Sequence, residues 1–127
     1  MLKAAGKPNK NSLIKVNKNQ AKNPLVQNLH PSSYVLTDTN PSFSVNEGFV
    51  EDFQINPGTA VLFLQLQFHL HKPLYIKDRF AELSKYRQHC QKYLLLMSDC
   101  PDELNYITDL EIQCIQFDVK LLICWSF

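Results

Sequence analysis

Alternating apolar residues in the middle of the chain predict an antiparallel hairpin. Residues 49–55 and 60–69 flank the segment 56–59, Asn-Pro-Gly-Thr, whose composition suits a tight turn. Every second residue from Leu62 to Leu70 is apolar, so we expect one face of this strand to pack in a core. The opposite face begins apolar and becomes polar, and we expect it to be half exposed.

Two amphipathic helices and two further strands are predicted after the hairpin. Apolar residues recur at three- and four-residue steps over 74–93, and charged residues separate them. The uncharged run 93–97 is typical of a strand covered on both faces. Pro101 is expected to open a second helix with an apolar stripe from Leu104 to Cys114, and residues 119–125 a last strand. This order predicts a mixed sheet whose later strands are parallel, with right-handed crossovers.

The first third of the chain is rich in loop signals. Residues 1–10 combine Lys, Asn, Gly and Pro with almost nothing to bury, which predicts a disordered basic arm. The apolar residues Leu13, Ile14 and Val16 are expected to form a first strand. Three residues between 17 and 46 precede prolines, which disfavours helix, so we expect loops with one extended piece near 34–36.

Length and charge indicate one domain with an uneven charge distribution. With 127 residues and 45% hydrophobic side chains, the chain can build one domain with a substantial core, which we assign to residues 11–127. Six lysines lie in the first 22 residues, which contain no acid, whereas the other 105 residues carry seven basic and twelve acidic side chains. A nucleic-acid surface would therefore depend on these lysines and on local patches, unless the arm is only a solvated tail.

Cysteine, histidine and hydropathy patterns argue against several classes of site. The four cysteines form no C-x-x-C pair and no signal peptide precedes them, so we expect reduced, mostly buried thiols inside the cell. His69 and His71, with His89 or His30, lack a cysteine or carboxylate companion, which argues against a metal site. No apolar stretch reaches the length of a membrane span, and nothing indicates a cofactor or a membrane partner.

Several short segments occur in a characteristic order along the chain. They are Asn11-Ser12-Leu13-Ile14, Asn23-Pro24-Leu25-Val26, residues 60–64, Phe68-His69 with Pro73 and Tyr75-Ile76, and Cys124-Trp125-Ser126. Together they resemble the central domain of the excision repair cross-complementation group 1 family, the non-catalytic partner of the xeroderma pigmentosum group F nuclease. The similarity runs from about Asn11 to Ser126, with an apparent insertion near residues 37–47.

The resemblance implies an α/β fold of the restriction-nuclease type. In this fold a mixed sheet, a hairpin plus parallel strands, is flanked by helices, and here the catalytic residues are absent. The implied role is that of a nuclear scaffold in nucleotide excision and interstrand crosslink repair. The implied partners are a group A type damage-verification protein, single-stranded or junction DNA and, in a full-length form, a group F type nuclease subunit. The family's C-terminal helix-hairpin-helix module is not found in residues 1–127.

The hairpin lacks the acids that a nuclease of this architecture needs. Active relatives carry an Asp on the first arm and a Glu and a Lys on the second, which hold metal ions and orient water. Asp52 fits the first position, but residues 62–64 are Leu-Phe-Leu, and 60–71 contain no Asp, Glu, Lys or Arg. The alternative, an active metal-dependent nuclease, would need a second acid beside Asp52, from Glu51 or Asp78. A truncated form with no independent role is a third interpretation.

The resemblance also implies a groove that accepts a short glycine-rich and aromatic segment of the damage-verification protein. The matching positions are Asn23, Phe63, Gln65, Gln67, Phe68 and Tyr75. Aromatic walls supply contact area at little entropic cost, and amides bond to the backbone of an extended ligand. Relative to the family, Phe68 replaces a tyrosine, Gln67 an arginine and Gln65 a serine, which bears on ligand preference.

Weak binding of single-stranded DNA is expected beside this groove. The candidate backbone contacts are Lys18, Asn19, Gln20 and Lys22, since lysine neutralises phosphates and amides hydrogen-bond to them. Ordinary structural roles stay open for the groove residues as well. Phe63 and Phe68 are equally compatible with a core, Asn23 with a turn, and Tyr75 with the start of a helix.

Overall fold

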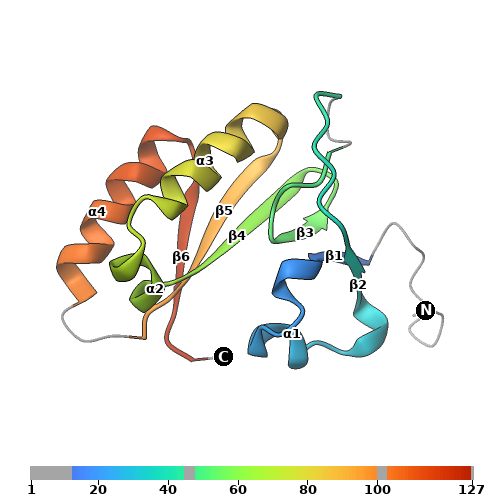
Figure 1. The fold of residues 1–127 in the computed structure, drawn as a ribbon, viewed down its shortest axis with the longest axis horizontal. Helices are drawn as coiled ribbons and strands as arrows, with labels where there is room; N and C mark the ends of the chain where they lie inside the picture. Colours follow the sequence, from blue (N-terminus) through green and yellow to red (C-terminus); the bar gives the residue numbers. More distant parts are fainter. Residues whose placement is uncertain (1–12, 45–47, 100–102, 127) are drawn as a thin grey trace, which may run out of the picture.

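The computed structural model describes residues 13–44, 48–99 and 103–126, in which a six-stranded mixed sheet has the order β2-β1-β3-β4-β5-β6 (Figure 1). The strands are β1 (Ile14–Asn17), β2 (Tyr34–Thr37), β3 (Phe53–Asn56), β4 (Thr59–Gln65), β5 (Gln91–Met97) and β6 (Lys120–Cys124). The helices are α1 (Pro24–Gln27), α2 (Leu66–His71), α3 (Tyr75–Tyr86) and α4 (Glu103–Gln116), with 3-10 turns η2 (Lys18–Gln20) and η3 (Pro31–Ser33). The predicted arm 1–10 and helix start at Pro101 lie outside the described residues.

The predicted hairpin and the parallel later strands are confirmed. β3 and β4 pair antiparallel, whereas β4 with β5 and β5 with β6 pair parallel. The turn is held by the Gly58 amide, which donates to Asn56 Oδ1 at 2.9 Å. The first arm is shorter than predicted, because Phe49 forms only an isolated bridge with Asn40. The parallel pairing of β1 with β2 was not predicted.

Two apolar clusters lie on opposite faces of the sheet. The larger one joins Ala60, Leu62 and Leu64 of β4 to apolar residues of β5, α3 and α4, as the alternation in β4 predicts. A smaller cluster joins Val16, Phe53 and partly buried neighbours to Val26 of α1. Figure 1 accordingly shows α2, α3 and α4 grouped around β4–β6 and α1 beside β1 and β2. No helix in the described part of the chain is long and apolar enough to cross a membrane.

The predicted strand over 60–69 is wrong beyond Gln65, where the chain turns into α2. Asp99, at the end of β5, accepts a hydrogen bond from the Gln67 amide at 2.9 Å and so caps the start of this helix. Leu66 and His69 are buried at helical spacing, whereas Phe68 and Leu70 are each 39% exposed. A contact from a residue more than thirty positions away therefore overrides the local alternation.

The predicted helix over 74–93 ends earlier, at Tyr86. Arg87 leaves the helix and becomes fully buried, with its Nη2 atom 3.2 Å from Glu51 Oε2 and 2.7 Å from the Pro57 carbonyl oxygen. The Gln91 amide then donates to the Gly58 carbonyl at 2.8 Å and starts β5 beside β4. The buried ion pair thus terminates the helix and anchors the following segment to the hairpin turn.

The N-terminal loops contain short helical turns that were not predicted. Asn23 and His30 are extended, as expected of residues before proline, yet each one caps a turn that the proline begins. The extended piece near 34–36 is confirmed as β2, and the first strand as β1.

Some residues expected in the core are exposed. In the predicted apolar stripe of α4, Leu104 is 74% exposed, whereas Ile107, Leu110 and Cys114 are buried. Because α4 meets the sheet only at one stripe, Leu104 lies outside that contact. Among the described residues Cys90 and Cys114 are buried and in no disulfide bond, Cys124 is partly exposed, and Cys100 lies outside the described residues. Burial raises the pKa of the Cys114 thiol to about 11, so this thiol is protonated at neutral pH.

Candidate partner-binding site

An open pocket of about 300 Å³ lies where β4 ends, between the η2–α1 segment and the start of α3. Its lining consists of Asn19, Gln20, Lys22, Asn23, Pro24, Phe63, Leu64, Gln65, Phe68 and Tyr75. Five of the six predicted groove residues and three of the four predicted DNA contacts are therefore brought together in one place. The sequence analysis gave the peptide groove and the DNA contacts as two neighbouring sites, and the structure places most of their residues in a single pocket.

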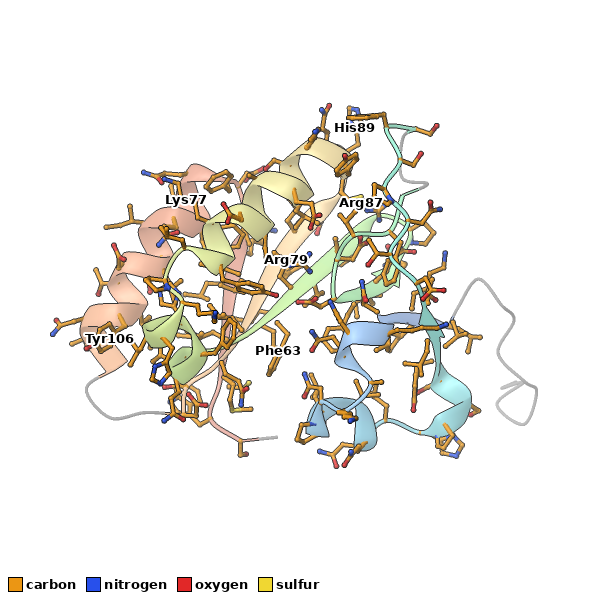
Figure 2. All side chains as sticks on the ribbon, viewed as in Figure 1. Phe63, Lys77, Arg79, Arg87, His89 and Tyr106 are labelled. Carbon is orange, nitrogen blue, oxygen red and sulfur yellow. The ribbon has the colours of Figure 1, made fainter. Side chains whose placement is uncertain are left out.

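Aromatic side chains form one side of the pocket. Phe68 and Tyr75 meet edge to face, with ring centroids 5.1 Å apart. Phe68 is 39% exposed and is not a core residue, whereas Phe63 is half-buried against the smaller apolar cluster. Figure 2 shows Phe63 on β4, in the gap between α2 and the segment that carries α1. The pocket therefore offers ring surface that solvent still reaches.

Amide groups form the other side, and Asn23 organises them. Its Oδ1 atom accepts from the Leu25 amide at 2.9 Å and caps α1, and its Nδ2 atom donates to Gln20 Oε1 at 3.0 Å. Pro24 at the first helical position adds the rigid ring that completes this corner. Asn23 therefore both caps the turn and lines the pocket, because its cap fixes the loop that forms this side of the pocket.

Two predicted residues are not brought to the pocket. Gln67 is exposed on α2 and outside the lining, because the helix rotates it away from Gln65, which a continued strand would have kept on the same face. Lys18 lies elsewhere on the surface, where its Nζ atom is 3.3 Å from Asp38 Oδ2 in an exposed ion pair. Local backbone geometry, rather than residue chemistry, keeps these two side chains out of the pocket lining.

A buried carboxylate, Asp52, connects several parts of the lining. Its Oδ2 atom accepts from the Phe63 amide at 2.8 Å, and its Oδ1 atom lies 2.7 Å from Arg79 Nη2. Asn19 adds a side-chain hydrogen bond. Arg79 also donates from Nη1 to the Val50 carbonyl at 3.0 Å and to Glu82 Oε1 at 2.6 Å. Figure 2 shows Arg79 between α3 and the β3–β4 hairpin.

The ion pair between Asp52 and Arg79 also interacts with Tyr75, which belongs to the aromatic wall of the pocket. Tyr75 lies one helical turn before Arg79, within hydrogen-bonding range of its side chain, and burial together with the Asp52 charge raises the pKa of the Tyr75 phenol. Burial raises the pKa of Asp52 as well, and Arg79 and the Phe63 amide offset part of that shift. Arg79 was missed from the sequence; its four-residue spacing from Tyr75 was the available signal.

The donor set at Asp52 does not fit a metal ion. Both oxygens of this carboxylate already have partners, a guanidinium and a backbone amide. Glu51, the neighbouring acid, pairs with Arg87 instead, and Asp78 is exposed on α3. Within residues 13–44, 48–99 and 103–126, no three His, Cys, Asp or Glu side chains gather in a way that could hold a metal. Two-metal hydrolysis has no ligands at this hairpin.

The histidines whose pattern argued against a metal site have different surroundings in the structure. His69 is buried and its Nδ1 atom has no hydrogen-bond partner among the described residues, whereas His71 is exposed. Burial lowers the pKa of His69, and Asp109 opposes part of that shift. His30 Nδ1 serves its own loop by accepting from the Ser32 amide at 3.1 Å.

Comparison with known families agrees with this geometry. The sequence model of the family described as "Binding domain of DNA repair protein Ercc1 (rad10/Swi10)" matches residues 11–127. The match covers all six strands and all four helices of the described structure. The expected restriction-nuclease-like α/β fold is thereby confirmed. The chain belongs to the Ercc1 (rad10/Swi10) family of DNA repair proteins, and its residues 11–127 are the family's non-catalytic binding domain.

Proposed function

We propose that this pocket receives a short, extended, glycine-rich and aromatic segment of a group A type damage-verification protein. The observation that carries the proposal is one open pocket with solvent-accessible rings on one side and loop and strand amides on the other. The domain would then recruit a nuclease to damaged DNA in the nucleus. It would contribute binding, while a group F type subunit would supply catalysis.

The chemistry of the lining suits such a ligand. An incoming aromatic ring can pack on Phe68 and Tyr75, which meet edge to face and of which Phe68 is 39% exposed. The side chain of Gln65 is exposed at the end of β4, where it can bond to the backbone of an extended peptide. Glycines in the ligand would allow that backbone to approach closely. Few side chains become immobilised, which keeps the entropic cost of binding low.

Removal of the Phe68 ring is expected to weaken peptide binding by about tenfold or more, because an interface aromatic supplies both apolar area and ring stacking. The measurement is fluorescence anisotropy of a labelled peptide with a Gly-Gly-Gly-Phe core, titrated with wild type and Phe68→Ala. Gln67→Ala is the matched control, since Gln67 is exposed on the same helix but outside the pocket. Equal affinities for wild type and Phe68→Ala would refute the proposed site.

Asn23 needs a different substitution, because its side chain caps α1. Asn23→Ala would remove the cap and cost about 1 kcal/mol of stability, which confuses folding with binding. Asn23→Ser keeps a capping oxygen and removes only the amide. A loss of affinity in Asn23→Ser at unchanged melting temperature would therefore assign the amide to ligand recognition.

We further propose that single-stranded DNA binds weakly at the same pocket. Asn19, Gln20 and Lys22 line it, and Lys22 forms no salt bridge with any described residue. Peptide and DNA would then compete. We expect Lys22→Ala to weaken oligonucleotide binding and to reduce the slope of log affinity against log salt by about 1. An unchanged slope, or simultaneous binding of peptide and oligonucleotide, would contradict a shared site.

Pairing with a group F type nuclease subunit is proposed only for a form that also carries a helix-hairpin-helix module. Residues 11–127 would then act as the recruiting domain, preceded by the lysine-containing residues 1–10. Co-purification of the two subunits with and without that module would test this division of labour.

A further inference from the structure

β6 is one of the two edge strands of the sheet that the described residues form. The strand order ends at β6, and its only partner among the described strands is β5. The Cys124 carbonyl faces β5, where it accepts from the Ser98 amide at 2.8 Å. Main-chain groups alternate in direction along a strand, so those of Leu121 and Ile123 point away from β5. Four backbone hydrogen-bonding groups are thus presented at this edge.

Nothing in the described structure blocks this edge. Exposed edge strands are usually protected by a proline, a bulge or a charged side chain. β6 contains no proline, and its register with β5 runs without a shift. Its single charged residue, Lys120, has its Nζ atom 5.7 Å from the centre of the Tyr93 ring on β5, so the charge is directed back over the sheet. The edge is therefore open to another strand.

Apolar surface flanks the edge on both faces of the sheet. On one face, a groove of about 280 Å³ separates β6 from α4, lined by Glu111, Cys114, Ile115, Val119, Leu121 and Ile123. Ile115 is 78% exposed at the rim of this groove. On the other face, Leu122 is 50% exposed. A strand laid along β6 would send alternate side chains to these two surfaces.

The charge around the groove is negative. Glu111 lies in the lining and Asp118 lies two residues before the start of β6, and neither forms a salt bridge with a described residue. Lys120 does not offset them, because its charge lies over Tyr93 on the opposite face. A complementary ligand therefore carries basic side chains beside its apolar ones.

We propose that the free edge of β6, together with the groove between β6 and α4, binds an extended segment of a partner protein by strand addition. The segment alternates apolar side chains and is flanked by lysine or arginine. Backbone hydrogen bonds to Leu121 and Ile123 supply affinity, and the apolar groove supplies selectivity. This surface is separate from the pocket at the end of β4, since the two share no lining residue.

Amide hydrogen exchange followed by NMR tests the proposal. The probe is a heptapeptide of alternating valine and threonine between two lysines, at on the order of millimolar concentration, as expected for a short augmenting strand. In the free protein the amides of Leu121 and Ile123 exchange rapidly, and the probe slows both by about tenfold or more. Ile115→Lys abolishes this protection. Ile112→Lys, on the same helix but outside the groove, retains it.

Two further experiments test which kind of molecule binds at the β6 edge. A peptide with glutamates in place of the lysines binds less tightly, and Glu111→Lys reverses that preference. The proposal is overturned if the probe leaves the Leu121 and Ile123 amides unprotected, or if Ile115→Lys and Ile112→Lys behave alike. It is also overturned if both amides are already protected without the probe and that protection grows with protein concentration. In that case the occupant is a second copy of the chain.

Discussion

Replacing Arg87 with methionine is expected to lower the free energy of unfolding by about 3–5 kcal/mol, the usual cost of breaking a buried ion pair from one side. The substitution would leave Glu51 as a fully buried carboxylate without its counter-charge. It would also remove the hydrogen bond from the Arg87 guanidinium to the Pro57 carbonyl, which ties the end of α3 to the hairpin turn. Urea denaturation monitored by circular dichroism measures the loss.

Two companion variants separate charge from packing in this prediction. Lys77→Met, at an exposed position on α3, should change stability by no more than about 0.5 kcal/mol. The double variant Glu51→Leu with Arg87→Met should recover part of the loss, because no unpaired charge stays buried. A loss below about 1 kcal/mol in Arg87→Met would show that this pair does not stabilise the domain.

Replacing Arg79 with methionine is expected to damage both stability and ligand binding. Asp52, with a side chain 1% exposed, would lose the counter-charge that Arg79 supplies, at a cost of about 3–5 kcal/mol. Because the pair lies between the Phe63 backbone and Tyr75, the aromatic wall would lose its support. We expect peptide affinity to fall by about tenfold or more, measured by anisotropy at a temperature where the variant is folded.

Glu82 provides the matched control for Arg79. Its carboxylate also binds the Arg79 guanidinium, but its side chain is 36% exposed, and such pairs contribute about 0–1 kcal/mol. Glu82→Gln should therefore leave both stability and peptide affinity nearly unchanged. Equal losses in Glu82→Gln and Arg79→Met would mean that the helix surface, rather than the buried Asp52 pair, supports the pocket.

The sheet was predictable because its signals are local. Apolar alternation assigned Leu62 and Leu64 to the core, and the uncharged run that ends at Met97 marked a buried parallel strand. The start of α2 was not predictable, because the cap on Gln67 comes from Asp99, a residue distant in sequence. The end of α3 was not predictable either, since a buried pair with Glu51 determines it.

The residues of the pocket were likewise only partly predictable from the sequence. Asn23, Phe63, Gln65, Phe68 and Tyr75 were assigned from a family resemblance, and the structure places all five around one opening. Gln67 was assigned from the same resemblance, but it lies on α2 and outside the lining of this pocket. The ion pair between Asp52 and Arg79 was not predicted, because the sequence does not show which charged side chains become buried on folding.

The most direct test of the account is an NMR structure of the domain with the Gly-Gly-Gly-Phe peptide, solved from intermolecular nuclear Overhauser effects. We predict that the phenylalanine ring of the peptide shows such contacts to Phe63, Phe68 and Tyr75, the three rings of the pocket. Adding Mg²⁺ should leave the resonances of Asp52 and its neighbours in place. Peptide contacts confined to another surface, or Mg²⁺-dependent shifts centred on Asp52, would contradict the account.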